Sequence, residues 1–420
     1  MSAESQLIER PRPFYAWVVF ILSVLFNAYT VTLQFSPSAE IIMIQDMGNA
    51  KEIVYALIAF YYTFALFQVP SGILIDRYGA RIFPSIGVLL CAIGGIIMSQ
   101  AEMSWHIAVA RGIIGVGATF SFLNALKIIN NWFQPKRFSY LLGLFIALVS
   151  LVVVLLKAAF LHLDQILTWR GAALSFGIGG LVFAGIYFFV MQDSPLSGSS
   201  RIPDRKAFWE NIRSVFNTSH VWIAGMAVGL MIGPLFAFEA IWSIPFVQAA
   251  YKAPLSTAIM YNLLLMFGYA VGAVFFGRVS TSIRKRKIFI VWGIAVALMM
   301  LVIILYPPYL GIQVTSICFF VLGFAASNSN IGYTVVHEHN VPQVTATAIA
   351  VVNTFYALFA AISQTFISAL LELNLHHPQA AATEQFQMSL IRLPIYLVIA
   401  LVFSFFMKET YCNQRQTYDD

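Results

Sequence analysis

The chain has 420 residues, of which 60% are hydrophobic and only 10% are charged. A water-soluble globular protein needs roughly a quarter of its residues charged, so this composition excludes that class and predicts a membrane protein. The formal net charge of +6 gives no reason to expect a nucleic-acid partner, because basic loops between membrane spans account for it.

Apolar stretches long enough to cross a bilayer recur along the whole chain. The hydrocarbon core is about 30 Å thick, and a helix of roughly 20 apolar residues spans it. The sequence therefore predicts an all-α membrane protein with twelve transmembrane helices, at residues 14–34, 53–73, 82–100, 105–129, 138–162, 171–191, 220–248, 255–278, 288–306, 311–335, 344–371 and 389–407.

Basic residues are unevenly divided between the two sets of loops. If the first helix enters from the cytoplasm, the external loops receive only Lys51, Arg170, Lys252 and Arg392. The positive-inside rule then places both termini in the cytoplasm, and we expect a multi-pass protein of a bacterial inner (plasma) membrane. The first apolar run is too long for a cleaved signal peptide, so we expect it to remain as the first helix.

The turn between the second and third predicted helices reads Gly72-Ile-Leu-Ile-Asp76-Arg77-Tyr-Gly79-Ala-Arg81. An acid at such a place can pair with basic residues or with a helix N-terminus, and the pairing changes when the helices separate. Glycine suits a tight turn and a close helix approach because it has no Cβ. The simpler alternative is a solvated loop that only follows the charge asymmetry.

Three basic side chains fall inside the fourth and fifth predicted helices. An unpaired guanidinium in a membrane costs roughly 2.5–3.5 kcal/mol, so Arg111 should face the bundle interior, with an anionic partner, water or helix-end carbonyls. Lys157 has two interpretations, binding the solute or reaching the external interface. Lys127, near the inner end of its helix, is expected to extend its amine to the interface.

A polar interval at 193–219, the longest between predicted spans, divides the chain. It contains Ser197-Gly-Ser-Ser and several basic residues, which is typical of a linker. The sequence thus predicts an N-terminal six-helix bundle at 1–192, a cytoplasmic linker at 193–219, and a C-terminal six-helix bundle with a short tail at 220–420.

Glu239 is an acidic residue within the apolar seventh helix, flanked by Phe236 and Phe238. Apolar surroundings favour a protonated carboxyl, which is the form that a proton-coupling group needs to adopt during transport. The alternative is that Gly233-Pro234 breaks the helix and places Glu239 near the outer mouth.

A degraded internal repeat follows the eighth helix. Gly277, Thr281 and Arg286 stand at the offsets that the first glycine, the acid and the last arginine have in the motif after the second helix. A repeat half a chain apart predicts two similar bundles with a substrate site at their interface near mid-membrane.

A cation from the N-terminal half, Lys157, and a carboxylate from the C-terminal half, Glu239, would hold a zwitterion such as an amino acid. Amides and phenols inside the helices would line a cavity or join helices by hydrogen bonds. These polar residues are Asn27, Tyr29, Gln34, Asn124, Tyr261, Asn262, Tyr269, Asn328, Asn330, Tyr333, Asn353, Tyr356 and Gln364.

Other chemistries lack their sequence patterns. Cys91, Cys318 and Cys412 have no disulfide or metal-binding spacing. His337-Glu338-His339 has no third metal ligand specified. No phosphate-binding Gly-x-x-x-x-Gly-Lys-Ser/Thr motif and no catalytic spacing is present. We therefore expect no metal, no cofactor and no enzymatic activity, and an ion gradient as the energy source.

The segment Gly72–Arg81 resembles the loop signature of the major facilitator superfamily, Gly-x-x-x-Asp-Arg-x-Gly-x-Arg, at each specified position. Arg111-Gly-Ile-Ile-Gly115-Val-Gly117 is similar to the family pattern of helix four, and Trp169-Arg170-Gly resembles the start of helix six. With the six-plus-six layout, the likeness covers nearly the whole chain. It implies two pseudo-symmetric six-helix bundles that rock to give alternating access.

The resemblance also implies roles for particular residues. It makes Gly72, Asp76, Arg77, Gly79 and Arg81 a conformational latch. It assigns Arg111 to proton coupling or gating, and it places Asn27, Asn328 and Asn353 in the cavity. The chain departs from the family at Thr281, where an acid is often found, and it lacks the Gly-Pro-rich helix-five signature of many drug–proton antiporters. The second departure favours import over efflux.

Taken together, these features predict a secondary active transporter that works as a monomer surrounded by membrane lipid. We expect proton-coupled uptake of a small polar organic nutrient such as an amino acid. The alternatives are proton-driven efflux of a drug or metabolite and, from another class, a membrane sensor that binds a solute without moving it.

Overall fold

The computed structural model describes residues 13–34, 50–193, 205–306, 310–375 and 382–413, and every regular element within these ranges is a helix. Twelve of its segments are long and apolar enough to cross a membrane. The predicted all-α fold with twelve spans is confirmed.

The N-terminal half carries six of these spans in five long helices, because the fifth and sixth spans run on within α6. Thr168 has φ 70° inside α6 and interrupts its helical path there. The helices of this half are α1 (Pro13–Gln34), α3 (Ala50–Tyr78), α4 (Ile82–Ser99), α5 (Ser104–Trp132), the short η1 (Pro135–Arg137) and α6 (Phe138–Val190).

The C-terminal half follows a helix that the sequence did not predict, α8, which lies inside the interval assigned to the linker. Pro234 and a π-helical turn, η2, interrupt the seventh span. The helices are α8 (Arg205–Asn217), α9 (Ser219–Ala237), η2 (Phe238–Trp242), α10 (Ser243–Tyr251), α11 (Leu255–Ile283), α12 (Lys287–Leu305), α13 (Ile312–Ala326), α14 (Ser329–His339), η3 (Pro342–Val344), α15 (Thr345–Leu375), α16 (Ala382–Leu390) and α17 (Arg392–Phe405).

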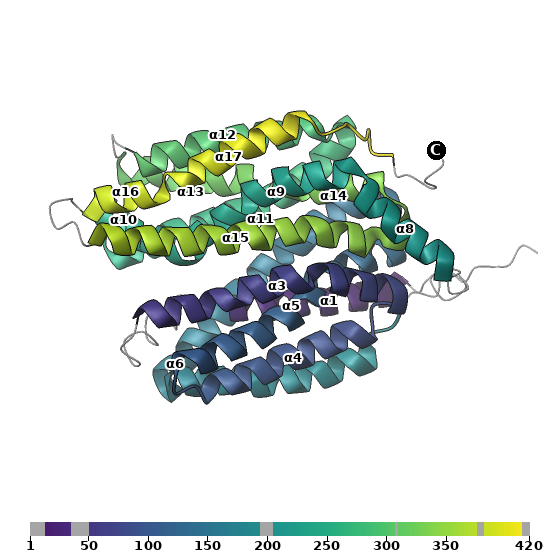
Figure 1. The fold of residues 1–420 in the computed structure, drawn as a ribbon, viewed down its shortest axis with the longest axis horizontal. Helices are drawn as coiled ribbons and strands as arrows, with labels where there is room; N and C mark the ends of the chain where they lie inside the picture. The colour runs from purple at the N-terminus through teal and green to yellow at the C-terminus, as the bar shows by residue number, and fades with distance from the viewer. Residues whose placement is uncertain (1–12, 35–49, 194–204, 307–309, 376–381, 414–420) are drawn as a thin grey trace, which may run out of the picture.

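The two halves lie side by side with their helices roughly parallel to the long axis of the molecule (Figure 1). They meet along α3 with α15 and along α6 with α11. We call the end that carries α8 and the last turn of α3 the linker end, and the opposite end the far end.

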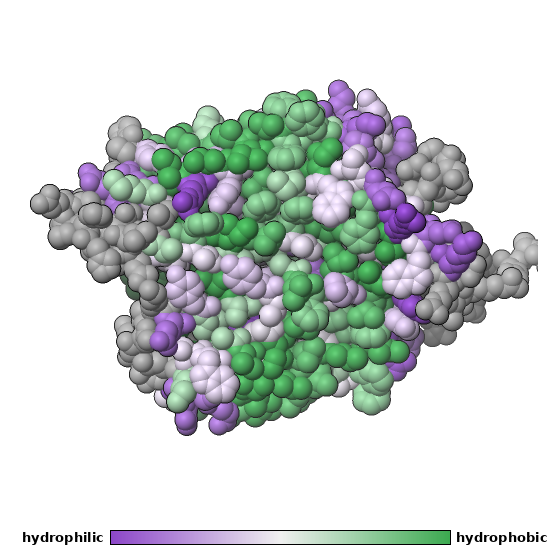
Figure 2. All heavy atoms as spheres, viewed as in Figure 1, coloured by the Kyte–Doolittle hydropathy of each residue, from purple (hydrophilic) through white to green (hydrophobic). Residues whose placement is uncertain are grey.

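The molecular surface fits a bilayer. Figure 2 shows a broad apolar belt across the helices, with hydrophilic residues gathered at the two ends. Large apolar side chains of the membrane spans are exposed, including Leu66 at 71% and Ile317 at 61%. Exposed apolar area of this extent is stable in hydrocarbon and not in water.

Helix α3 extends further than the sequence predicted. Asp76 and Arg77 were expected on a turn, but they form the last turn of α3, which continues to Tyr78. Gly79 then ends the helix with φ 87°, and its N–H donates to the carbonyl of Ile75 at 2.9 Å. A glycine in the left-handed region is the usual way to stop a helix, so the turn begins at Gly79 and leaves Asp76 on a rigid element.

Candidate functional site

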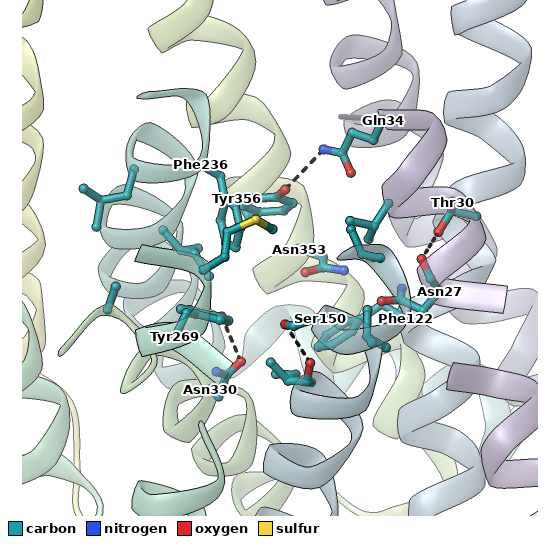
Figure 3. A pocket seen from close by; sticks show the side chains of 18 of the residues that line it. Asn27, Thr30, Gln34, Phe122, Ser150, Phe236, Tyr269, Asn330, Asn353 and Tyr356 are labelled. Carbon is teal, nitrogen blue, oxygen red and sulfur yellow. Dashed lines mark hydrogen bonds between the residues drawn. The ribbon is translucent and has the colours of Figure 1, made fainter. Parts of the chain in front are cut away.

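A cavity of about 160 Å³ lies between the two halves, with room for on the order of ten water molecules. Figure 3 shows side chains from both halves pointing toward its centre. Its walls are largely apolar and include Phe64, Phe122 and Phe236. The polar side chains that line it are Asn27, Thr30, Gln34, Ser121, Ser150, Tyr269, Asn330, Tyr333, Asn353 and Tyr356.

On the N-terminal side of the cavity, hydroxyls and one amide form a small cluster. The Asn27 amide donates to Ser121 Oγ at 2.9 Å, and the Thr30 hydroxyl lies 3.1 Å from the same oxygen. Asn27 and Thr30 are three residues apart, so α1 presents both on one face toward α5. This cluster holds the Asn27 side chain in a fixed direction at the cavity wall (Figure 3).

On the C-terminal side, two phenols are bonded to amides. Tyr333 donates its hydroxyl to Asn353 Oδ1 at 2.7 Å, and Tyr269 donates to Asn330 Oδ1 at 3.2 Å. An amide NH₂ has two N–H donors; that of Asn330 uses one on the Ser327 carbonyl at 2.9 Å. The cavity therefore offers a solute both donors and acceptors from neutral groups, and none of the described lining side chains carries a formal charge.

The three asparagines predicted for the cavity divide into two groups. Asn27 and Asn353 lie in its lining. Asn328 does not, because the helix is interrupted between α13 and α14. The Asn328 side chain there turns back to the carbonyl of Ala325 and packs against Gly293. Asn330, two residues further on, lines the cavity in its place.

Lys157 belongs to α6, one helical turn beyond the cavity residue Val153. Its side chain falls outside the described residues, so its predicted role as a cation for the solute stays a prediction.

Arg111 is buried, with 2% of its surface exposed, and it lies outside the cavity lining. Its guanidinium donates to the carbonyls of Leu33 at 2.6 Å and Gln34 at 3.1 Å, which end α1. Its Cζ lies 5.5 Å from the centre of the Phe60 ring. Of the partners that the sequence left open for Arg111, the structure places helix-end carbonyls beside it.

Glu239 is also buried, with 2% exposed, and it stands in the π-helical turn η2. A π turn shifts the hydrogen-bond register and frees a carbonyl, and such turns are frequent at functional sites. Here the Glu239 carbonyl accepts from the Asn262 amide of α11 at 2.7 Å. Pro234 thus does not move Glu239 to an exposed mouth. The residue lies outside the cavity lining, three positions after the lining residue Phe236.

The halves are joined at the linker end by Asp76. Its carboxylate accepts hydrogen bonds from the N–H groups of Ala346 at 3.2 Å and Thr347 at 2.7 Å, and from the Thr347 hydroxyl at 2.8 Å. These residues form the first turn of α15, where N–H groups have no intrahelical partner and the helix dipole favours an anion. An acid of one half thus caps a helix of the other.

The cation that accompanies Asp76 is Lys127 of α5. Lys127 Nζ lies 2.6 Å from Asp76 Oδ1, and the two side chains are 8% and 0% exposed. It also donates to the Gln343 carbonyl of the other half at 3.3 Å. The expectation that Lys127 extends its amine to the membrane–water interface is therefore wrong, because its ammonium pairs with the buried Asp76 carboxylate instead. A clue was available, since both charges were predicted near the same end of their helices.

The basic residues of the motif point elsewhere. Arg77 is exposed and stacks on Tyr78. Arg81 donates to the Phe188 carbonyl at 3.1 Å, within its own half.

The second copy of the motif also takes part in a buried ion pair, but here the motif supplies the cation, whereas the first copy supplies the acid. Arg286, at the repeat position of Arg81, pairs with Glu338 of α14 at 2.7 Å, and Thr281 accepts from Arg286 at 3.1 Å. The Arg286 guanidinium also lies 3.4 Å from Ser139 Oγ of the N-terminal half. The acid missing at Thr281 is thus supplied by Glu338, which no sequence pattern marks as an ion-pair partner.

A histidine also spans the halves near Arg286. The His337 ring stacks on Phe138 at 3.7 Å between centroids, and its Nε2 lies 2.9 Å from Asn130 Oδ1. No group of three potential metal ligands occurs among the residues that the structure describes.

Both repeat glycines lie where the halves touch. A Cβ added to Gly72 would lie 2.8 Å from the Cβ of Ala350 and 2.9 Å from the Ala346 carbonyl oxygen of α15. One added to Gly277 would lie 2.6 Å from the Ser139 carbonyl oxygen of α6. The close approach at the linker end therefore requires glycine at both positions.

We expect Gly72→Ala to weaken closure of the linker end, because overpacking costs about 1–3 kcal/mol and separation of α3 from α15 relieves it. Alkylation of a cysteine placed at the cavity residue Ser150, by a reagent added from the linker side, should become faster. Gly185→Ala is the control, since its Cβ would meet nothing within 4 Å. Equal alkylation rates in both variants would contradict this interpretation.

A profile of the Major Facilitator Superfamily matches residues 17–364. The chain is 25% identical over 281 residues to the probable L-galactonate transporter of Escherichia coli (strain K12), a match that covers 61% of each protein. It is 26% identical over 166 residues to the nitrate/nitrite transporter NrtP of Nostoc punctiforme, over 34% of this chain and 32% of that one. The matched region thus spans less than two thirds of either relative.

Solved structures share the fold. The proton:xylose symporter XylE aligns with a TM-score of 0.73 at 14% identity, over 96% of this chain and 98% of that one. A bacterial homologue of the human lysosomal transporter Spinster aligns with a TM-score of 0.69 at 19% identity, over 94% and 97%. The profile match covers most of the chain, and the resemblance seen in the sequence motifs is confirmed: this protein belongs to the Major Facilitator Superfamily.

Proposed function

We propose that the protein is a secondary active transporter that moves a small polar organic solute across a membrane by alternating access. The observation that carries this proposal is a cavity between two similar halves, with amides, hydroxyls and phenols set in largely apolar walls, together with the contact of Asp76 with the first turn of α15 at the linker end. A contact of this kind can form and break as a unit when the halves rock, which is what alternating access requires.

The basic residues of the loops support an orientation with the linker end in the cytoplasm. In that orientation both termini are cytoplasmic, and Gly72, Asp76, Gly79 and Lys127 form an inner latch, with Arg77 and Arg81 beside it. A bacterial inner membrane is the proposed location, and a monomer in lipid is the proposed state.

The solute is proposed from the lining. Amides, hydroxyls and phenols both donate and accept, and the aromatic walls suit a small molecule with some apolar surface. An amino acid, which the sequence favours, requires Glu239 and Lys157 to provide its charge partners. A hydroxylated organic acid is the second candidate, because its hydroxyls match the neutral lining and a relative carries the name of an L-galactonate transporter.

Proton coupling is proposed through Glu239. A carboxyl in a membrane interior that gains and loses a proton gives a transporter its link to a proton gradient. The π turn that carries it follows directly from the helix that lines the cavity with Phe236, so a change at Glu239 is transmitted to the cavity wall.

Transport by the purified protein tests the function. A thermal-shift screen against amino acids, sugar acids, nucleosides and sugars selects the solute, and uptake into proteoliposomes is then measured with and without a pH gradient. Concentrative uptake that disappears when the gradient is collapsed supports proton-coupled import. Export from loaded vesicles indicates the efflux alternative, whereas binding without countertransport indicates a sensor.

We expect Asn353→Ala to weaken solute binding about tenfold, because it removes a cavity amide and leaves the Tyr333 hydroxyl without its acceptor. The KM for uptake measures the effect. Asn328→Ala is the matched control, since it removes a buried amide outside the cavity and should leave KM unchanged. Equal KM values for the two variants would argue against this cavity as the binding site.

A further inference from the structure

Arg111 lies outside the cavity but bonds the backbone of a residue that lines it. We infer that Arg111 is a positioning residue, which holds Gln34 in place so that its amide can reach Tyr356 in the other half. The inference deepens the proposed function and rests on it for its consequence in transport, but its geometry can be tested without any solute.

The Arg111 guanidinium contacts the C-terminal end of α1. The last carbonyls of a helix have no intrahelical partner, and a cation is favourable there because of the helix dipole. Arg111 Nη1 donates to the Leu33 carbonyl at 2.6 Å and Nη2 to the Gln34 carbonyl at 3.1 Å. Nε lies 3.5 Å from the Leu57 carbonyl of α3. The guanidinium thus fixes the end of α1 relative to α3 and α5.

Gln34, whose carbonyl Arg111 holds, extends its side chain toward the other half. Gln34 lines the cavity, and its Nε2 donates to the Tyr356 hydroxyl at 3.4 Å. Tyr356 belongs to α15 of the other half and lies edge-on to Phe64 and Phe236. Figure 3 shows its hydroxyl facing the Gln34 amide. The backbone carbonyl of Gln34 therefore accepts a hydrogen bond from the Arg111 guanidinium, while its side-chain amide joins the two halves.

The chemistry of the guanidinium limits what Arg111 can do. Arginine is not deprotonated in proteins, so Arg111 itself cannot carry a proton back and forth during transport. Its planar group with several fixed donors is suited to holding carbonyl oxygens in a defined geometry. These properties favour a positioning role over proton transfer.

The test uses spin labels on cysteines placed at two exposed sites on opposite halves, Tyr55 of α3 and Phe366 of α15, in a Cys412→Ser background. Inter-label distances are measured in detergent without solute. We expect Arg111→Gln and Gln34→Ala each to raise the population of longer distances about fivefold, the factor for one lost hydrogen bond. The double variant should add nothing, and Arg111→Lys should restore part of the effect.

Arg170→Gln is the matched control. Arg170 also donates to a backbone carbonyl near a helix end, that of Ala101 two residues after α4, at 3.0 Å, but it lies away from the cavity lining, so this variant should leave the distances unchanged. Additive effects of Arg111→Gln and Gln34→Ala would overturn the inference, as would Arg111→Gln with unchanged distances. Neither outcome depends on whether the protein transports, so failure of the proposed function is seen separately in proteoliposomes.

Discussion

Asp76→Asn is expected to open the linker end. The substitution leaves the Lys127 ammonium buried without a charged partner and weakens the contacts with Ala346 and Thr347. Removing one member of a buried ion pair costs about 3–5 kcal/mol while the pair stays buried, and opening of the linker end relieves that cost. A bias of about 3 kcal/mol changes the ratio of closed to open molecules roughly a hundredfold, so a cysteine at the Ser150 position should react much faster with a reagent from the linker side.

The matched control for this experiment is Asp193→Asn. Asp193 is another acid at the linker end, but it accepts a hydrogen bond from the Ala80 N–H within its own half, so its loss should leave the contact with α15 intact. Solute uptake should fall at least tenfold in Asp76→Asn and little in Asp193→Asn. Unchanged cysteine reactivity in Asp76→Asn would remove Asp76 from the latch.

Glu239→Gln is expected to keep solute binding and to lose uphill accumulation. Glutamine has nearly the same shape as a protonated glutamate. The Asn262 amide donates to the backbone carbonyl of residue 239 and not to its side chain, so the π turn should persist. A side chain that cannot release a proton breaks the link to the proton gradient. Counterflow of the selected solute should remain near the wild-type rate, while accumulation driven by a pH gradient falls to the equilibrium level.

Glu210→Gln serves as the control for loss of a carboxylate, because Glu210 is exposed on α8. It should behave as the wild type in both assays. Normal concentrative uptake by Glu239→Gln would show that another group carries the proton. Loss of counterflow together with accumulation would instead indicate a role in binding.

The membrane fold could be predicted from the sequence because it depends on local properties. A run of about 20 apolar residues is stable as a membrane-crossing helix whatever surrounds it, so the spans could be placed to within a few residues. The α8 helix was missed because it lies in a polar interval, and three of its side chains, Phe208, Ile212 and Val215, are buried where α8 packs against α9, η3 and α15. Its pattern is weaker than that of a membrane span.

The contacts of the site depended on how the helices are rotated and broken. Asn328 and Asn330 are two residues apart, and the break between α13 and α14 decides that only Asn330 lines the cavity. The basic neighbours Arg77 and Arg81 looked like partners of Asp76, yet Lys127 pairs with it because α5 packs against α3. Proximity in the chain was a poor guide to proximity in space.

The class of protein, the twelve spans, the two similar halves and the presence of ionisable groups inside the spans could all be predicted from the amino-acid sequence, because hydropathy and motif spacing are properties of single segments. The partners of these groups followed from the packing of the helices: Asp76 with Lys127 and the first turn of α15, Arg111 with the end of α1. A buried charge or amide must be satisfied by whichever group packing brings within about 3 Å, and that depends on the register between helices far apart in the chain.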